Sequence, residues 1–478
     1  MTDDHMGALT STFVGPRAGV KLDLDEAAER VRRERQKERF ANRRVLWRIS
    51  EQKGIRACGR GVIDHDQGVT FKRRNGRVHT SGTTRCHSIW CCPVDAAKIR
   101  SVRSDDASEA CVRHIEAGGT AYLVTLTARH YRRHGLAELM DAIRGAFTAL
   151  TSGAQWAGDK NRGRDGERQR MGIVGIIRST EVTHSERNGW HPHLHLIVLM
   201  GAVQNPRPEI PRKANRPEGW TMPEWDPTPT GHFFVPDPKA DRRDLTGAEL
   251  QRVRDFERMQ ERWDRTWANW LDKHGFKPSK KHGVKWDRIK TVRDAKKLGE
   301  YVAKIQEGTG KKAREVGVGN EVARLDMKSG AKMRGGDATS RTPFEMLTEY
   351  RQLRALDADT AVQLGVDIDA RLKRLHALWH EYETATKGRR AIEWSRHLRD
   401  ALGMGEELDD QEAAEAEEGG DGFAAVDTDT WRRICRLHLD YDVTMAAELG
   451  GFTGLTEALD VLGLTATRLD PSPRDQSA

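Results

Sequence analysis

Three histidines at alternate positions open an otherwise apolar segment that runs from Gly189 to Met200, with the sequence GWHPHLHLIVLM. The segment shows no helical period and is rich in branched residues, so it predicts a β-strand. Alternate side chains of a strand share a face, which places His191, His193 and His195 in one row at a spacing of roughly 6.6 Å. Imidazole is the commonest protein metal ligand and binds in its neutral form. The segment therefore predicts a metal site on one face of a sheet.

The charge distribution indicates what such a site acts on. The chain carries 80 Lys and Arg against 72 Asp and Glu, a net charge of +8 and a pI near 9.1. Acidic residues gather between positions 406 and 418, where there is no Lys or Arg, so the remainder is more basic than the net charge suggests. Basic blocks spread along a chain favour a phosphate-backbone partner, here a nucleic acid. These blocks lie at residues 30–48, 72–77, 207–216 and 273–297.

No apolar run approaches the ~20 residues of a membrane span, so we expect no membrane association. The N-terminal residues lack the basic and apolar regions of an export signal, which favours the cytoplasm. Four of the six cysteines lie between positions 58 and 92. In a cytoplasmic protein such a cluster indicates a metal knuckle rather than a disulfide framework.

The pattern along the chain predicts four regions. A basic N-terminal arm or helix occupies residues 1–50, and a Cys-rich segment occupies residues 51–105. Strands and helices alternate over residues 106–320, interrupted by a Pro-rich insertion at 201–245. A helical region with an acidic linker at 405–422 covers residues 321–478. Within the third region we expect strands at 120–127, 172–183, 189–200 and 284–289 and helices at 136–150, 246–274 and 293–306.

The last of these helices carries a second chemical feature. Lys297, Tyr301 and Lys304 are spaced to share one helix face, so a phenol lies between two ammonium groups. Nearby cations favour the phenolate, which is the stronger nucleophile, and they can also hold a phosphate. Together with the histidine row, this predicts that the Tyr301 oxygen attacks a scissile phosphate. A divalent ion would serve as Lewis acid and template, and the products would be a 5′-phosphotyrosyl protein and a free 3′-hydroxyl.

Histidine–hydrophobic–histidine on a strand, followed by Tyr-x-x-Lys on a helix, resembles the HUH endonucleases. The fuller pattern, EVT at 181–183 with NGWHPHLH at 188–195 and LVTLT at 123–127, is similar to the rolling-circle replication initiators (Rep) of actinobacterial plasmids. The resemblance covers roughly residues 55 to 310, with a weaker echo at 392–395. It implies a ferredoxin-like core with an antiparallel sheet. Together with the mainly helical C-terminal region that the sequence pattern predicts, this gives an α+β fold. It also implies nicking and rejoining at a plasmid double-strand origin.

The same resemblance implies Mg²⁺ or Mn²⁺ as cofactor, with His193 and His195 as ligands and Tyr301 as nucleophile. Glu181 is our choice for the third donor, and His191 or His184 are the alternatives. The hairpin register decides between them, because a two-residue turn at 188–189 places His184 opposite His193. A one-residue bulge instead brings Glu181 to the metal face.

The cysteine region resembles that family's Cys-x₅-Cys-Pro-x-Cys element, with Cys86 and Cys92 in matching positions and Asp95 where a cysteine is expected. Cys58 can supply a further ligand, which implies a structural zinc. A carboxylate is an acceptable zinc ligand; otherwise Cys91 or His87 takes its place, or the site is lost.

The expected partners are plasmid origin DNA, duplex and single-stranded, and a host helicase and polymerase. Ending replication needs a second cleavage, which requires either a second protomer's Tyr301 in a dimer or water activated by a carboxylate such as Glu300. The alternatives are a single-strand transposase or mobilisation relaxase, or a non-catalytic regulator with a zinc knuckle. A tyrosine that follows the histidines in sequence favours Rep or transposase over relaxase.

Overall fold

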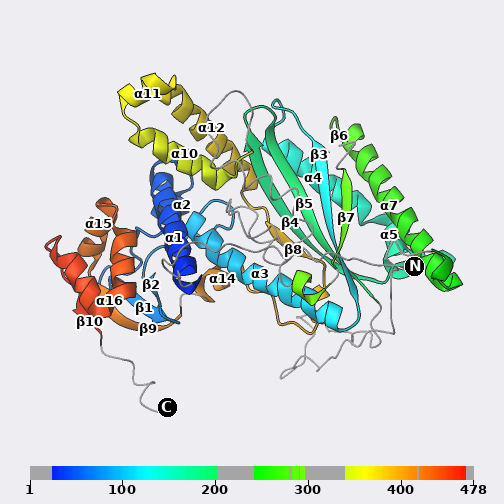
Figure 1. Ribbon diagram of the computed structural model, residues 1–478, viewed down its shortest axis with the longest axis horizontal. Coiled ribbons are helices and arrows are strands. Elements are labelled where there is room, and N and C mark those ends of the chain that lie inside the picture. Colours follow the sequence, from blue (N-terminus) through cyan, green and yellow to red (C-terminus); the bar gives the residue numbers. More distant parts are fainter. Residues whose placement is uncertain are drawn as a thin grey trace, which may run out of the picture.

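The computed structural model describes residues 24–201, 242–278, 283–289, 291–295, 340–416 and 419–469. These residues form two antiparallel sheets surrounded by helices, which confirms the expected mixture of helices and antiparallel strands (Figure 1). Within the described residues, no helix combines the length and the apolar character that a membrane crossing requires. Most of the Pro-rich insertion, and the 293–306 helix beyond Ala295, lie outside the described part of the chain.

The larger sheet has six strands, and the histidine strand β5 lies at its centre. The strand order is β6-β3-β5-β4-β8, with β7 also paired to β3. The pattern of the sequence located the central strands well, because they are the most apolar segments of the chain. The bounds are Thr120–Arg129 (β3), Ile173–Ser185 (β4), Gly189–Met200 (β5), Lys277–Pro278 (β6), Val284–Ile289 (β7) and Ile392–Trp394 (β8).

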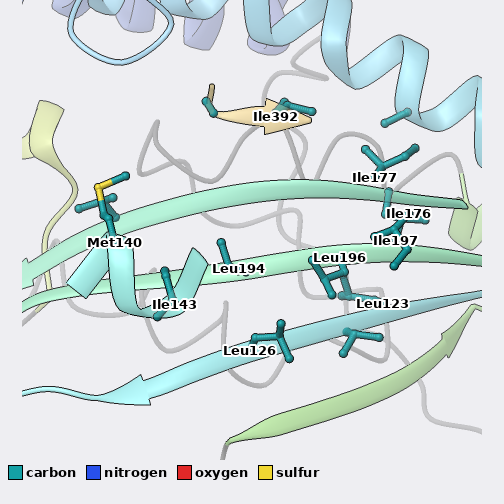
Figure 2. Packing of buried hydrophobic residues seen from close by; sticks show 14 of the residues in the cluster. Leu123, Leu126, Met140, Ile143, Ile176, Ile177, Leu194, Leu196, Ile197 and Ile392 are labelled. Atoms are coloured by element: carbon teal, nitrogen blue, oxygen red, sulfur yellow. The ribbon is translucent and has the colours of Figure 1, made fainter. Parts of the chain in front are cut away.

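Helices cover one face of this sheet. Helix α4 (Leu136–Leu150) packs beside α7 (Gly247–Lys273). Met140 and Ile143 of α4 belong to the same buried cluster as Leu126 and Leu194 of the strands (Figure 2). The side chains of Tyr122 and Trp286 lie on this same face of the sheet, where their rings contact Phe256 of α7. Helix α7 begins with a capping box, in which the side chains of Thr246 and Glu249 each accept a hydrogen bond from the other residue's backbone N–H. The helix therefore starts close to the position that the sequence predicted. The row of His193 and His195 has the other parity along β5, so it lies on the opposite face.

The hairpin between β4 and β5 fixes the register. Ser185 pairs with Gly189, which leaves a three-residue loop, and Gly189 takes a φ of 78° that favours glycine. Glu181 consequently pairs with His193, whereas His184 pairs with Trp190 on the other face. The two-residue turn that we considered is therefore wrong, and the longer loop brings Glu181 to the histidine face.

The smaller sheet joins the two ends of the chain. Its order is β10-β9-β1-β2, so strands from the Cys-rich region pair with strands from the last sixty residues. Helices α15 and α16 pack on it around Phe71 and Trp431, whose rings meet edge to face at 6.2 Å. The sequence predicted helices here but not these strands. The bounds are Val69–Arg74 (β1), Arg77–Ser81 (β2), Asp421–Val426 (β9), Thr467–Arg468 (β10), Thr428–Arg436 (α15) and Asp440–Asp460 (α16).

Helix α1 (Leu24–Ile49) connects the two parts. We predicted an arm, but Leu46 and Trp47 near its end are buried. Arg43 is also buried, and its guanidinium bonds to Asp440 of α16 at 2.7 Å. The second half of α1 is therefore part of the interior. Figure 1 shows α1 and α3 between the two sheets.

The remaining elements surround these parts. Helix α3 contacts α1 and the start of β3, α12 contacts α4, and α14 contacts α3. Their bounds are Lys53–Ala57 (α2), Pro93–Glu116 (α3), Gly153–Ala157 (α5), Lys160–Arg162 (η1), Glu167–Arg170 (α6), Arg242–Asp244 (η3), Pro343–Ala355 (α10), Ala358–Leu364 (α11), Ile368–Thr386 (α12), Leu398–Ala401 (α13) and Asp410–Ala416 (α14).

Candidate functional sites

One carboxylate oxygen and two imidazole nitrogens converge on the face of the larger sheet that is opposite α4 and α7. Glu181 Oε2 lies 3.0 Å from His195 Nε2 and 3.5 Å from His193 Nε2. The His193 and His195 rings are 5.7 Å apart, and the His191 ring lies 4.0 Å from that of His193. The side chain of His195 is 5% exposed and that of His193 is 17% exposed, so the site is closed at His195 and reached from the His193 side.

Two threonines of the LVTLT segment lie beside these histidines on the neighbouring strand β3. Thr125 pairs with His195, and Thr127 pairs with His193. Thr125 Oγ1 lies 3.2 Å from His195 Nδ1, so one ring nitrogen is held by the hydroxyl while the other faces Glu181. A second partner of this kind fixes the ring orientation of a metal-ligating histidine.

The surroundings keep the imidazoles of His193 and His191 neutral. Burial, with smaller contributions from His195 and His130, lowers the pKa of His193 to about 3. Burial and the neighbouring His193 hold the pKa of His191 well below its ordinary value. The neutral form is the one that binds a metal ion, so the site presents donors ready for coordination.

A fourth histidine, which the sequence analysis did not identify, belongs to this cluster. The His130 ring stacks on that of His191 with centroids 4.1 Å apart. His130 directly follows β3, and burial lowers its pKa. Its position after the LVTLT strand was the one available signal, because the end of β3 lies beside the start of β5 in an antiparallel pair.

A second cluster lies where the Cys-rich segment meets the start of α3. Ligand atoms of Cys58, Cys86, Cys92 and Asp95 all lie within 4.8 Å of one another. The sulfurs of Cys58 and Cys92 are 3.7 Å apart, and Asp95 Oδ2 is 3.4 Å from the Cys58 sulfur and 3.3 Å from that of Cys86. In tetrahedral zinc geometry, sulfurs lie about 3.8 Å from each other and about 3.5 Å from a carboxylate ligand. The spacing therefore fits a tetrahedral ion.

Local structure builds this second cluster around Asp95. His87 has a φ of 47°, and the backbone N–H groups of Cys86 and His87 both donate to Asp95 Oδ2. Hydrogen bonds from the Cys86 and Cys92 thiols, helped by Arg43 and Arg85, hold the pKa of Cys58 well below its usual value. A thiolate is the form that binds metal.

Cys91 does not belong to this cluster, so our inclusion of it was wrong. Its sulfur lies 3.7 Å from Thr386 Oγ1, and burial raises its pKa to about 12. The side chain points away from Cys92 because adjacent residues at the start of a helix project in different directions. The His87 ring is also outside the cluster and approaches Glu415 at 4.0 Å.

The chain resembles a known replication protein over most of its length. It is 39% identical to "Protein rep" of Streptomyces lividans over 400 residues, which covers 77% of this chain and 76% of that protein. The chain belongs to the Rep proteins of actinobacterial plasmids. A "Neomycin resistance protein" of Streptomyces cyanogenus is 43% identical over 156 residues, which cover 29% of this chain and 36% of that protein. No family model and no solved structure matches the sequence.

Within this Rep protein, the structure brings together Glu181, His191, His193 and His195 from two adjacent strands. His184, an alternative ligand, is on the other face, where its ring meets Trp190 at 4.8 Å. The predicted nucleophile Tyr301 lies outside the described residues, as do Lys297, Glu300 and Lys304. Their roles stay predictions.

Proposed function

We propose that the chain nicks one DNA strand at a plasmid origin and later rejoins it, with Tyr301 as the nucleophile. The observation that supports this most directly is the convergence of Glu181 Oε2 on the Nε2 atoms of His193 and His195. A carboxylate with two imidazoles is a donor set that suits a divalent ion. The name of the Streptomyces lividans relative agrees with a role in replication.

The residues present fit such an ion. If His195 Nδ1 donates to Thr125, the lone pair on Nε2 faces the Glu181 oxygen at 3.0 Å. Two acceptors at that distance repel each other, and a cation between them removes the repulsion. His193, His195 and Glu181 would hold Mg²⁺ or Mn²⁺, with His191 as a further donor. When bound, the ion supplies Lewis acidity and a template for the scissile phosphate.

Tyr301 would perform the displacement. Its oxygen forms a bond to phosphorus while the bond from phosphorus to the 3′-oxygen breaks, and the 3′-oxygen leaves as a hydroxyl. The phenol loses its proton and the leaving oxygen gains one. Lys297 and Lys304 would favour the phenolate and hold the phosphate oxygens, because opposite charge stabilises both. The bond energy is kept in the phosphotyrosine, so the strand can be rejoined.

The point where the chain re-enters the described structure after Tyr301 supports this assignment. Strand β7, which precedes Tyr301, pairs with β3 along residues 121–126. Arg341, which follows it, exchanges backbone hydrogen bonds with His184 of β4 at 2.8 Å in both directions. The chain therefore re-enters the described structure beside β4, close to the hairpin that carries the histidines, whereas β7 ends opposite Ala121, away from them.

The second cleavage that ends replication needs another nucleophile. We propose either Tyr301 of a second protomer or water activated by Glu300. A Glu300→Gln variant that nicks and terminates like the wild type excludes the water route through this residue.

A covalent-capture experiment tests the proposed function. An origin oligonucleotide is labelled on both sides of the nick and incubated with protein and Mn²⁺. Only the 3′-side fragment should remain attached after boiling in detergent, and mass spectrometry should locate it on the peptide 298–304. The Tyr301→Phe variant keeps the ring and should bind DNA without attachment. Attachment at Tyr131 or Tyr350 would assign another nucleophile, and binding without any attachment would favour the regulator.

We also propose that the Cys58, Cys86, Cys92 and Asp95 cluster holds a structural zinc. Among the described residues Asp95 Oδ1 is buried without a hydrogen-bond partner, and it lies 3.7 Å from Arg85 Nη1. Zinc there would couple α3 to the segment around Cys58 and contribute to folding.

A further inference from the structure

A cleft of about 400 Å³ lies outside both clusters. Four elements from distant parts of the chain line it: α1, β2 with the loop after it, the start of α3, and α16. Nothing in the mechanism proposed above uses this cleft.

Helix α1 contributes a basic stripe to the cleft. Arg32, Arg35 and Arg39 line it at helical spacing, together with Gln36 and Phe40. Residues 32 and 39 are separated by about 10 Å along the helix axis.

The other walls add more positive charge. Arg77 and Arg85 come from β2 and its loop, and Lys98 and Arg100 come from α3. Arg85 is held in place, because its Nη2 donates to the carbonyl of Thr80 at 3.1 Å and its Nη1 lies 3.7 Å from Asp95. One wall of the cleft is thus built directly on the Cys and Asp cluster.

Seven Lys and Arg side chains line the cleft against two carboxylates, those of Asp105 and Glu448. Arg32 is paired with Glu448 and also with Glu29, which is not part of the lining. The chain's own acidic segment does not fill it in the described residues. Its Glu407 and Asp410 each lie 3.1 Å from Arg103, which is on the other side of α3 from Lys98. The cleft therefore has a net positive charge that an anionic ligand would stabilise.

We propose that this cleft binds the phosphate backbone of DNA, as a second contact outside the nicking site. The proposal rests on the proposed function, since it takes DNA as the substrate. The α1 stripe spans about three phosphate-to-phosphate intervals of one strand, at ~3.4 Å of axial rise each.

The lining favours a backbone over a free nucleotide. Phe40 is the one Phe, Tyr or Trp among the lining residues. Its ring is already in contact with Tyr441 at 5.6 Å and with the Arg43 guanidinium at 4.5 Å. The base of a nucleotide could not stack between two aromatic rings in this cleft, whereas phosphate groups could accept hydrogen bonds from several guanidinium groups.

Salt-dependent binding by the full-length protein tests this proposal. The probe is a labelled mixed-sequence duplex of about 30 base pairs, and its single strand, in EDTA so that no cleavage occurs. Arg35 and Arg77 are both exposed, so an Arg35→Ala, Arg77→Ala variant should fold normally. Binding should weaken, and the slope of log affinity against log salt should fall by about 1 to 2.

The matched control removes two exposed arginines from α7, on the far side of the larger sheet (Figure 1). The Arg254→Ala, Arg258→Ala variant changes the net charge equally and should keep the wild-type slope. An equal loss in both variants, or an unchanged slope in the cleft variant, overturns the proposal. ATP binding that is lost in the cleft variant, with DNA binding intact, assigns the cleft to a small phosphate ligand and also overturns it. Because no cleavage is measured, the result is independent of whether Tyr301 attacks.

Discussion

Glu181 lies directly opposite His193 in the pairing of β4 with β5, and its Oε2 also reaches His195 at 3.0 Å. Cross-strand partners in an antiparallel pair have the closest side chains in a sheet. The site is therefore held by the ladder itself rather than by mobile loops. A change at Glu181 acts on the donor set without altering the strands.

The first prediction concerns metal dependence. Glu181→Ala, or the His193→Ala, His195→Ala pair, should abolish nicking and weaken Mn²⁺ binding in a calorimetric titration. Duplex binding should remain, because it depends on Lys and Arg contacts to phosphate. EDTA should stop the wild-type reaction, and Mg²⁺ or Mn²⁺ should restore it.

His184→Gln is the matched control, since His184 lies on the same strand but on the other face. It should keep the Mn²⁺ affinity of the wild type. Thr125→Val should lower that affinity by about 10- to 100-fold, because it removes the partner of the His195 ring. Full nicking activity in the double histidine variant would contradict the metal site.

The second prediction separates two adjacent cysteines. Cys92→Ser should lose bound zinc in elemental analysis and lower the thermal midpoint, because a structural zinc contributes folding free energy. Cys91→Ser should keep the zinc, since that sulfur lies near Thr386 instead. Asp95→Cys should also keep it, because four thiolates form a suitable zinc site. Wild-type protein that contains no zinc would show that these are only buried thiols.

Local patterns in the sequence predicted the larger sheet well. The expected helix at 136–150 and strand at 284–289 match α4 and β7, and the histidine row is on one face as predicted. These features depend on periodicity within one segment, which a sequence displays directly. The same holds for the start of α7, where the Thr246 and Glu249 capping box is a local signal.

Features that depend on distant partners could not be predicted in this way. The small sheet pairs β1 with β9, some 350 positions later, and neither strand has a strong alternating pattern. The burial of Arg43 becomes understandable only with Asp440 beside it. His130 joins the site because β3 ends next to the start of β5, which is a matter of register. The direction of Cys91 likewise follows from the fold and not from its spacing.

The third prediction tests the connection between α1 and α16. Asp440 is fully buried, and its two oxygens accept from Arg43 at 2.7 Å and from Arg44 at 2.6 Å. Asp440→Ala leaves buried positive charge without a partner and should cost about 3 to 5 kcal/mol of unfolding free energy. Asp442→Ala, at an exposed position two residues later, should cost less than about 0.5 kcal/mol. Urea denaturation measures the unfolding free energy of both variants. Equal losses would mean that the buried ion pair contributes no more to stability than an exposed carboxylate does.

The fourth prediction concerns acid sensitivity through His114. Burial lowers its pKa, and hydrogen bonds to the backbone at Met200 and Thr120 oppose that shift. The folded protein therefore keeps His114 neutral at a pH where the unfolded chain, with a pKa near ~6.5, takes up a proton. Stability is fully present above that value and falls as the pH drops toward the folded pKa, by about 1.4 kcal/mol per unit for one group. The unfolding free energy from urea titrations should thus be lower at pH 5.5 than at pH 7.5.

The His114→Gln variant tests this prediction. Its side chain can still donate to the Met200 carbonyl but cannot titrate, so the unfolding free energy that it loses between these pH values should be smaller by about 1 kcal/mol. An identical loss in the variant would show that His114 is not kept neutral by its burial.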